Sequence, residues 1–372
     1  MKKRYWQLIF AVLLFLMVPA LEYLAMRNVD ITSADLRAAK GTRSDPPRFS
    51  FSAGGDMGDN STTSATLDLI AKSSVDFHLA IGDLSYGEIA PEAAWCKYVQ
   101  SHVGATFPFE LLAGNHEDGG EETGGGNIDN FVKCLPNRIK RIDGSDAISG
   151  TYGREYYFDY PPRAPIARFI LISPGMTYRT GGFYGYSVGT SHYNWVANTI
   201  DKARAAGIKW VIVAMHKNCI SMGIKTCEIG NDIFNLFVSK KVDLILQGHD
   251  HTYQRSKQLA LNGTTCIAIQ AETYNSHCVV NDGPTDSYTK GAGTVLVITG
   301  TVGADLYTIN TSDGDAGFFA RWMGSNYKPT NGFTKFTVTS DQLAVAASFL
   351  GSTAPKYFTD SFSITNAKPN VA

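Results

Sequence analysis

Residues 75–86, Val-Asp-Phe-His-Leu-Ala-Ile-Gly-Asp-Leu-Ser-Tyr, join an apolar strand pattern to a glycine turn that is followed by polar side chains. The same arrangement is expected at Arg48–Ala53 and at Phe107–Ala113, which precede Gly-Gly-Asp and Gly-Asn-His-Glu. Two segments with a helical period, Ser64–Lys72 and Glu92–Val103, separate these strands. Alternation of strands with helices is typical of βαβ units, so the sequence predicts an α/β fold.

The rest of the chain continues this alternation and then becomes richer in strands. We expect Tyr156–Tyr160 and Ile166–Ser173 as an antiparallel pair, helix Ser191–Ala206 with strand Lys209–Met215, helix Asn231–Ser239 with strand Val242–Leu246, and later strands at Thr265–Gln270, Thr294–Thr299, Phe333–Thr339, Leu343–Phe349 and Ser361–Thr365. Because neither a repeat nor a second linker interrupts them, one domain is expected over 48–366, between a linker at 28–47 and a tail at 367–372.

The composition excludes several classes of protein. Of the 372 residues, 44% are hydrophobic and 18% are charged, which is unlike a disordered or collagen-like chain. The 33 basic and 34 acidic side chains give a net charge of −1. Since this leaves no basic field over the whole chain, no nucleic-acid-binding surface is evident. The oligomeric state is not indicated.

The N-terminal segment 1–27 is predicted to direct export. Basic residues at positions 2 to 4 precede an apolar run from Leu8 to Leu21, which is the pattern of a secretory signal. The alternatives are an uncleaved membrane anchor over Tyr5–Met26, which polar residues and a proline interrupt, and a buried N-terminal helix. With a signal or an anchor, the main domain would be secreted, periplasmic, or membrane-attached outside the cytoplasm.

The six cysteines are even in number and include no C-x-x-C pair, which argues against a zinc knuckle. Cys219–Cys227 and Cys266–Cys278 would each close a short polar loop, and Cys96–Cys134 would then be the third pair. Disulfides are expected in an oxidising compartment, where each contributes about 2–4 kcal/mol. Fifteen connectivities are possible for six cysteines, and six buried free thiols are the alternative.

Polar side chains follow five of the predicted strands, at the edge where ligands bind in open α/β sheets. They are Asp56, Asp83, Tyr86, Asn115, His216, His249 and His251. We expect the neighbouring glycines to let the backbone turn sharply, so that these side chains point to one place. We expect His249 and His251 to occupy alternate positions of an extended segment, which would make them face the same side. Each signal is weak alone, but five in this order indicate a metal site.

Five motifs in this order resemble those of the purple acid phosphatases, a branch of the calcineurin-like metallophosphoesterases. They are D-x-G at Asp56–Gly58, G-D-x-x-Y at Gly82–Tyr86, G-N-H-E at Gly114–Glu117, V-x-x-H at Val213–His216 and G-H-x-H at Gly248–His251. Many metallophosphoesterases have histidine where this chain has Gly58, and Tyr86 is the compensating ligand of the purple branch. The resemblance covers most of residues 50–365. It implies a four-layer α/β/β/α sandwich of two mixed β-sheets flanked by helices.

The resemblance also implies two metal ions and the ligands of each. For a ferric ion the ligands would be Asp56, Tyr86 and His251. For a divalent ion, such as zinc, manganese or iron, they would be Asn115, His216 and His249, and Asp83 would bridge both ions. The chemistry agrees, because carboxylate and phenolate groups suit Fe(III) whereas imidazole and amide groups suit a divalent ion.

Three further residues have implied or possible roles near these ligands. His116 matches the acid histidine of the family and would protonate the leaving group after a metal-bound hydroxide attacks phosphorus. Glu117 is expected either to orient His116 or to be a surface carboxylate. Lys217 is expected either to contact the phosphate or another group of the substrate, or to be a solvated loop lysine.

Three functions are compatible with these residues. The first is an exported dinuclear phosphatase that hydrolyses small phosphomonoesters and works best in acid. The second keeps the site but hydrolyses phosphodiesters or nucleotides. The third is a surface protein that binds metal or phosphate without catalysis, which the presence of all seven ligands and His116 disfavours.

Overall fold

The computed structural model describes residues 47–118, 126–351 and 358–367 of the chain. The predicted signal or anchor at 1–27, nearly all of the linker at 28–47 and nearly all of the tail at 367–372 lie outside these residues. The described residues belong to a compact unit that begins at Pro47. Within them, none of the helices is long and apolar enough to cross a membrane.

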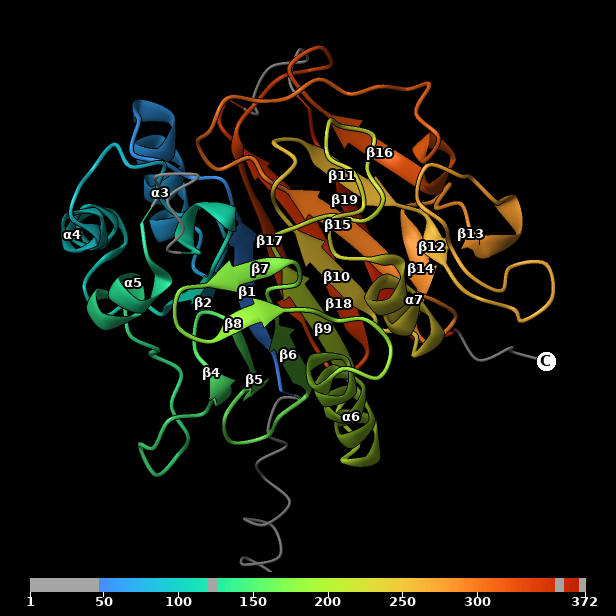
Figure 1. Ribbon diagram of the computed structural model, residues 1–372, viewed down its shortest axis with the longest axis horizontal. Helices are drawn as coiled ribbons and strands as arrows, with labels where there is room; N and C mark the ends of the chain where they lie inside the picture. The colour runs from blue at the N-terminus through green and yellow to red at the C-terminus, as the bar shows by residue number, and fades with distance from the viewer. Residues whose placement is uncertain (1–46, 119–125, 352–357, 368–372) are drawn as a thin grey trace, which may run out of the picture. The chain divides into compact units, whose positions relative to one another are not determined.

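Two mixed β-sheets form the centre of this unit (Figure 1). The first sheet contains, in spatial order, β14 (Ser287–Thr289), β19 (Ser361–Thr365), β18 (Gln342–Phe349), β17 (Gly332–Val338), β1 (Phe49–Gly54), β2 (Phe77–Ile81) and β3 (Phe109–Leu112). The second contains β16 (Phe319–Met323), β11 (Tyr253–Ser256), β15 (Val295–Thr299), β10 (Leu244–Gln247), β9 (Trp210–Met215), β6 (Ala167–Leu171), β5 (Glu155–Tyr160) and β4 (Ser149–Thr151). In the second sheet the central strands β15, β10, β9 and β6 are parallel, and antiparallel strands flank them. In the first sheet the parallel strands β1, β2 and β3 lie at one edge, and β1 pairs with β17 in the antiparallel sense.

Alternating side chains explain why the strands stack as two sheets. Ile212 of β9 belongs to an apolar cluster that contains strand residues from both sheets and no helix residue. Its neighbours Val211 and Val213 belong to a second cluster, which includes the helices. Aromatic rings from both sheets meet in the first cluster, and the ring centroids of Phe51 and Phe169 are 4.9 Å apart. Each such side chain contributes about 1.5–3 kcal/mol on burial, so this interior holds the sheets together.

Helices cover the outer faces of the sheets. They are α3 (Ser61–Lys72), α4 (Glu92–Val103), α5 (Ile128–Cys134), α6 (Ser191–Ala205) and α7 (Asn231–Ser239). In Figure 1, α3, α4 and α5 lie on the side of β1–β3, and α6 and α7 lie in front of the eight-stranded sheet. Helix α3 begins three residues before its predicted start, because the Asn60 side chain accepts hydrogen bonds from the N–H groups of Thr62 and Thr63. The expected fold class, two mixed sheets with flanking helices, is confirmed.

The prediction of a strand at Thr265–Gln270 is wrong. The side chain of Asn262 accepts hydrogen bonds from the backbone N–H groups of Thr264, Thr265 and Cys266. These local bonds use N–H groups that strand pairing would need. The structure also contains strands that the pattern did not predict, which are β4, β11, β14, β16, β7 (Met176–Tyr178), β8 (Gly182–Tyr184), β12 (Gln258–Leu259) and β13 (Val279–Asn281).

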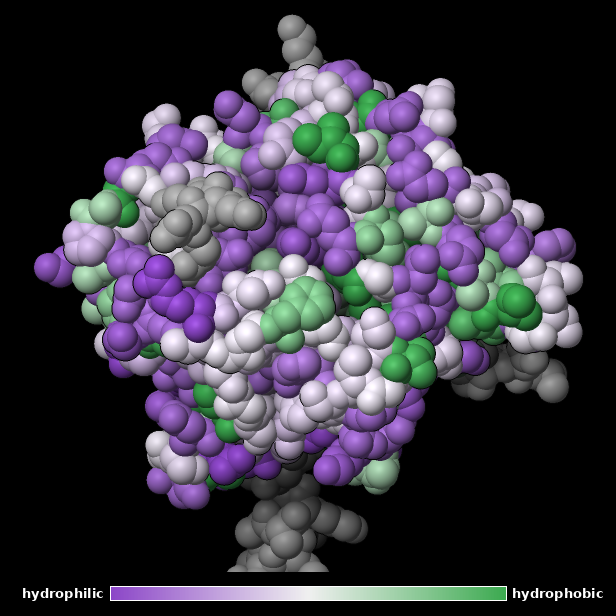
Figure 2. All heavy atoms as spheres, viewed as in Figure 1, coloured by the Kyte–Doolittle hydropathy of each residue, from purple (hydrophilic) through white to green (hydrophobic). Residues whose placement is uncertain are grey.

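All six cysteines are paired, as Cys96–Cys134, Cys219–Cys227 and Cys266–Cys278. The first pair joins helix α4 to helix α5, and the other two close short loops. Figure 2 shows that the face in view is mostly hydrophilic or neutral, with hydrophobic residues in separate small spots. Single exposed apolar side chains of this kind are normal for a globular protein.

Candidate metal centre

Five loops bring the predicted ligands together. The loops follow β1, β2, β3, β9 and β10, at the carboxyl ends of these strands. One ligand atom from each of Asp83, His216 and His249 lies within 4.8 Å of the other two, and the same holds for Asp56, Asp83 and His251. Because Asp83 belongs to both groups, the described residues form two adjacent half-sites that share one carboxylate.

Tyr86 and Asn115 each join one of these half-sites. Tyr86 Oη lies 3.2 Å from His251 Nε2 and 3.5 Å from Asp56 Oδ1. Asn115 Oδ1 lies 3.2 Å from His216 Nε2. All seven predicted ligand residues therefore lie in one cluster, and the phenol and the amide belong to different halves of it.

Three residues of the cluster adopt a left-handed backbone conformation, which residues other than glycine rarely do. The angle φ is 62° at Asp56, 49° at Asp83 and 65° at His249. The expectation that His249 and His251 lie on an extended segment is therefore wrong. Left-handed conformations cost about 1–3 kcal/mol each and persist where the surroundings impose them. Here the N–H group of His249 donates to Asp56 Oδ2 at 2.9 Å, and that of His116 donates to Asp83 Oδ1 at 3.1 Å. The loops thus hold the ligands in a preset geometry.

The glycines of the motifs allow sharp turns, and their lack of a side chain also leaves space for neighbouring ligand residues. Gly82 has a φ of 92°, as expected for a sharp turn, and a Cβ atom there would lie 2.5 Å from His216 Nδ1. Gly114 has a φ of −99°, which any residue can adopt. A Cβ atom at Gly114 would, however, lie 2.1 Å from Asp83 Oδ1. The expectation that glycines mainly provide sharp turns is therefore too narrow, because at Gly114 the close approach of a ligand excludes any side chain.

The second ring nitrogen of each histidine ligand candidate is held by a hydrogen-bond acceptor. The contacts are 2.9 Å from His216 Nδ1 to the carbonyl oxygen of Ile81, 2.8 Å from His251 Nδ1 to that of Asp305, and 2.7 Å from His249 Nε2 to Glu228 Oε1. An acceptor on one nitrogen places the ring proton there and leaves the lone pair of the other nitrogen available to a metal. The donor set and its orientation therefore fit two metal ions.

The cluster contains buried carboxylates, whose negative charge is stabilised by nearby positive charge. Asp56 is 0% exposed and Asp83 is 2% exposed. Burial lowers the pKa of His216, but the charges of Asp83 and Asp56 outweigh burial and raise this pKa to about 9. Burial, and then the charges of Asp56 and Asp83, raise the pKa of Tyr86 well above its ordinary value. A proton on His216 would offset part of this negative charge, Tyr86 would be a neutral phenol, and metal ions would displace both protons.

His116 is the most exposed histidine of the cluster. Its side chain is 22% exposed, against at most 8% for the three histidine ligand candidates. Its Nε2 lies 3.9 Å from Asp83 Oδ2, and its ring packs edge-on against Tyr86 with centroids 4.4 Å apart. A histidine in this place can meet a substrate that approaches from solvent.

Glu117 is fully buried beneath the same loops, so the alternative of a surface carboxylate is wrong. It accepts hydrogen bonds from the backbone N–H groups of Leu84, Ser85 and Gly114, at 2.8, 3.3 and 2.9 Å. These bonds tie the loop after β2 to the loop after β3. Burial, and then the charge of Asp83, raise the pKa of Glu117.

Two residues that touch the cluster were not predicted. The Tyr307 ring stacks on His251, with centroids 4.0 Å apart and an angle of 10° between the planes. Glu228 contacts His249 as described above, and it also binds Lys217, whose ammonium group lies 3.1 Å from Glu228 Oε2. Neither Tyr307 nor Glu228 stands in a motif. The nearest sequence signal is Cys227, which closes a short loop directly before Glu228.

Comparison with curated proteins gives purple acid phosphatases as relatives of this chain. Purple acid phosphatase 21 of Arabidopsis thaliana is 25% identical over 227 residues, which cover 58% of this chain and 47% of that protein. The Fe(3+)-Zn(2+) purple acid phosphatase 12 of the same plant is 26% identical over 226 residues, which cover 55% of this chain and 43% of that protein. This chain therefore spans about half the length of the curated relatives it matches.

Two solved structures share the fold. Purple acid phosphatase PPD1 from yellow lupin has a TM-score of 0.56 at 17% identity, over 87% of this chain and 54% of that chain. GAP50, the anchor in the inner membrane complex of Plasmodium, has a TM-score of 0.51 at 13% identity, over 86% of this chain and 90% of that chain. At these identities the likeness shows the fold alone.

The sequence profile of one family, described as calcineurin-like phosphoesterase, matches residues 53–253. This region contains all five loops of the cluster and more than half of the 372 residues. The chain is also similar to purple acid phosphatases, and its two half-sites share the carboxylate of Asp83, which can bridge two metal ions. On these grounds, the chain belongs to the calcineurin-like phosphoesterase family.

Proposed function

We propose that this protein is an exported dinuclear metallophosphatase that hydrolyses small phosphomonoesters in the manner of a purple acid phosphatase. The observation that carries the proposal is the pair of buried half-sites that share Asp83. Similarity to an Fe(3+)-Zn(2+) purple acid phosphatase supports a mixed pair of ions. In this proposal Asp56, Tyr86, His251 and Asp83 hold Fe(III), and Asp83, Asn115, His216 and His249 hold a divalent ion, which is zinc, manganese or iron.

When bound, the two ions would supply positive charge for the phosphoryl oxygens and a water acidic enough to act as the nucleophile. The residues of the chain orient the ligand side chains and supply one proton to the leaving group. His116, at the exposed side of the cluster, donates the proton that the leaving alkoxide needs. Glu117 fixes the loops that carry Asp83 and His116 through its hydrogen bonds to their backbone. Tyr86 supports His116 by edge-on ring contact.

The same cluster would also serve a phosphodiesterase or a nucleotidase, and the fold is shared by proteins with other roles. The presence of all seven ligand residues and His116 supports an enzyme over a binding protein. Three disulfides among the described residues support export, because such bonds persist in oxidising compartments.

The test is a visible absorption spectrum of the purified full chain, with metal content determined on the same sample. We expect iron plus a second metal, and a phenolate-to-Fe(III) charge-transfer band that disappears in Tyr86→Phe. Tyr307→Phe is the matched control, because it removes the other phenol beside His251 and should leave the band intact. A colourless protein that holds two zinc or two manganese ions would contradict the ferric assignment. A protein with both metals bound but no hydrolysis of phosphomonoesters would contradict the proposed activity.

A further inference from the structure

We propose that Glu228 is a positioning residue of the second half-site, which fixes the orientation and the tautomer of His249 and is itself held by Lys217. This inference rests on the proposed function, because it concerns His249 as a ligand of the divalent ion. Glu228 lies outside the five sequence motifs, 21 positions before His249.

The Glu228 carboxylate contacts both the imidazole ring of His249 and the ammonium group of Lys217. Oε1 lies 2.7 Å from His249 Nε2, and Oε2 lies 3.1 Å from Lys217 Nζ. Lys217 also donates to the carbonyl oxygen of Gly175 at 3.2 Å. A side chain with both oxygens engaged is held in one place, so its hydrogen bond also holds the His249 ring.

Glu228 contacts Nε2, one of the two nitrogens through which the His249 ring could bind a metal. Neither group of ligand atoms found among the described residues contains Glu228, whereas one of them contains His249 together with Asp83 and His216. Because Nε2 is bonded to Glu228, Nδ1 is the nitrogen that His249 offers to the cluster. An acceptor that keeps the proton on Nε2 therefore keeps the lone pair of Nδ1 available.

The backbone around this contact forms a closed ring of hydrogen bonds. The N–H group of Glu228 donates to the carbonyl oxygen of Asn218 at 3.0 Å. The side chain of Gln247, two residues before His249, donates to the carbonyl oxygen of Lys217 at 2.8 Å. The two partners of the Glu228–His249 contact are thus tied to the same short segment, Lys217–Asn218, which fixes their separation.

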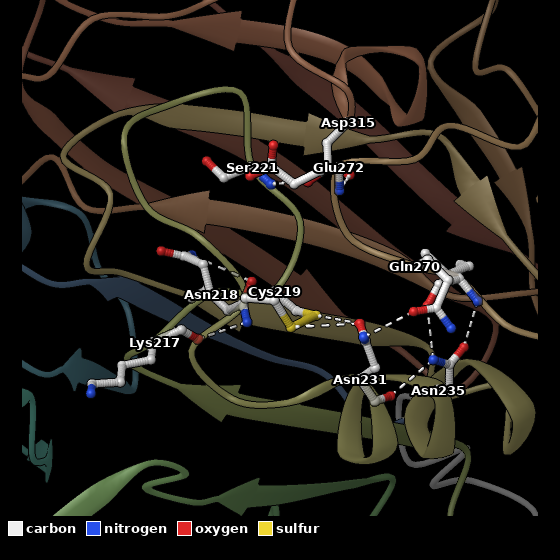
Figure 3. Close-up of a disulfide and its surroundings, with 12 residues drawn as sticks. Lys217, Asn218, Cys219, Ser221, Asn231, Asn235, Gln270, Glu272 and Asp315 are labelled. Carbon is white, nitrogen blue, oxygen red and sulfur yellow. Dashed lines mark hydrogen bonds between the residues drawn. A yellow bond between two sulfur atoms is a disulfide. The ribbon is translucent and has the colours of Figure 1, made fainter.

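The Cys219–Cys227 disulfide closes the loop directly before Glu228. Figure 3 shows its sulfur atoms beside Asn231 at the start of α7, and their distances to Asn231 Oδ1 are 3.5 and 3.7 Å. Asn231 in turn donates to Gln270 at 3.0 Å. The segment that carries Glu228 is therefore anchored by a covalent bond and by a helix.

The charges distinguish His249 from the other two histidine ligand candidates. In His216 and His251, Nε2 lies beside a ligand carboxylate and Nδ1 contacts a backbone carbonyl oxygen. In His249, Nε2 contacts the carboxylate of Glu228, which is not a ligand candidate. A carboxylate is the stronger acceptor and raises the basicity of the imidazole. Lys217 compensates the charge of Glu228, so the pair supplies this acceptor without adding net charge to the cluster.

The test is a titration of the metal-free full chain with Zn²⁺, in competition with a chromogenic chelator, to measure both binding steps. We expect Glu228→Gln to weaken one of the two sites about 10–100-fold and to leave the other unchanged, which is the usual effect of losing such a partner. The matched control is Glu155→Gln, because Glu155 Oε2 lies 2.8 Å from His192 Nδ1 in a similar pair outside the cluster. This control should bind Zn²⁺ as the unmodified protein does.

A second variant keeps the proposal testable if Glu228→Gln does not fold, which thermal unfolding of the metal-free protein would reveal. Lys217→Met should weaken the same site by a smaller factor, and the double variant should bind no more weakly than Glu228→Gln, because Lys217 acts through Glu228. Unchanged affinity in Glu228→Gln, equal loss in Glu155→Gln, or unchanged affinity in Lys217→Met would overturn the inference. An unmodified protein that binds fewer than two Zn²⁺ ions would instead contradict the proposed function.

Discussion

The interior between the two sheets and the loop edge that carries the metal centre are both buried. The interior is lined by apolar side chains, whereas the loop edge is lined by charged and polar ones. The interior contains stacked and edge-on aromatic rings, as where Phe51 contacts Phe169 and Phe336. The loop edge contains the carboxylates of Asp56 and Asp83, in a backbone conformation that costs free energy. The first region stabilises the fold, and the second is held in place by that stability.

Because of this difference, substitutions in the interior should mainly lower stability, and substitutions at the loop edge should mainly lower activity. Removing a ring from the interior leaves a cavity but does not touch the cluster. Removing a polar group from the loop edge changes the chemistry but takes little apolar surface from the core. Measurements of unfolding free energy and of kcat on the same variants would therefore test the comparison.

The largest effect is expected at the loop edge, in His116→Asn. Loss of a general acid lowers kcat about 10²–10⁴-fold, and the loss should be greatest for alkyl phosphates, whose leaving groups need a proton. p-Nitrophenyl phosphate, with a better leaving group, should be less affected. The control is His102→Asn, which removes another histidine beside a carboxylate, 2.8 Å from Asp68. Equal losses for both substrates would argue against the assigned role of His116.

The next effect is expected in the interior, in Phe51→Ala. The ring lies between Phe336 at 4.5 Å, Phe169 at 4.9 Å and Phe77 at 5.4 Å, measured between centroids. Its removal should lower the free energy of unfolding by about 3–5 kcal/mol, measured by denaturant titration. The kcat per folded molecule should remain unchanged. A large fall in kcat without a loss of stability would show that the two regions are not independent.

A smaller and pH-dependent effect is expected at His78 of β2, which stacks on Phe109 and bonds Ser52 Oγ at 2.8 Å. Burial lowers the pKa of His78 from 6.5 to about 3. Between these values the unfolded chain binds a proton that the folded protein does not, so stability falls as pH drops below about 6.5. The loss is on the order of 3 kcal/mol by pH 4.

His78→Gln removes this titration and should flatten the dependence of unfolding free energy on pH between 7 and 4. His192→Gln is the comparison variant, because the partly exposed His192 bonds Glu155 at 2.8 Å and is not confined to the core. If the unfolding free energy of His78→Gln falls between pH 7 and 4 as steeply as that of the unmodified protein, other buried groups dominate the loss of stability in acid.

Much of the fold followed from local patterns, and the failures have local causes. The βαβ order was predicted, because strand and helix periods can be read from consecutive residues. The pairing of two sheets was expected only from the resemblance to a known family. The strand expected at Thr265–Gln270 does not form, since the Asn262 side chain accepts hydrogen bonds from N–H groups at and just before its start. Short strands such as β16 were not predicted, because a few residues at a sheet edge carry little periodicity.

The sequence by itself determined the set of candidate ligands. Asp56, Asp83 and His249 each follow a glycine at a strand end, and the order of the five motifs is a property of the chain. The tertiary structure alone decided that Glu117 is buried under the loops and that Glu228 contacts His249. The physical reason is that a motif is read from neighbouring residues, whereas the contact between Glu228 and His249 exists only after a disulfide-closed loop and a strand end have been brought together.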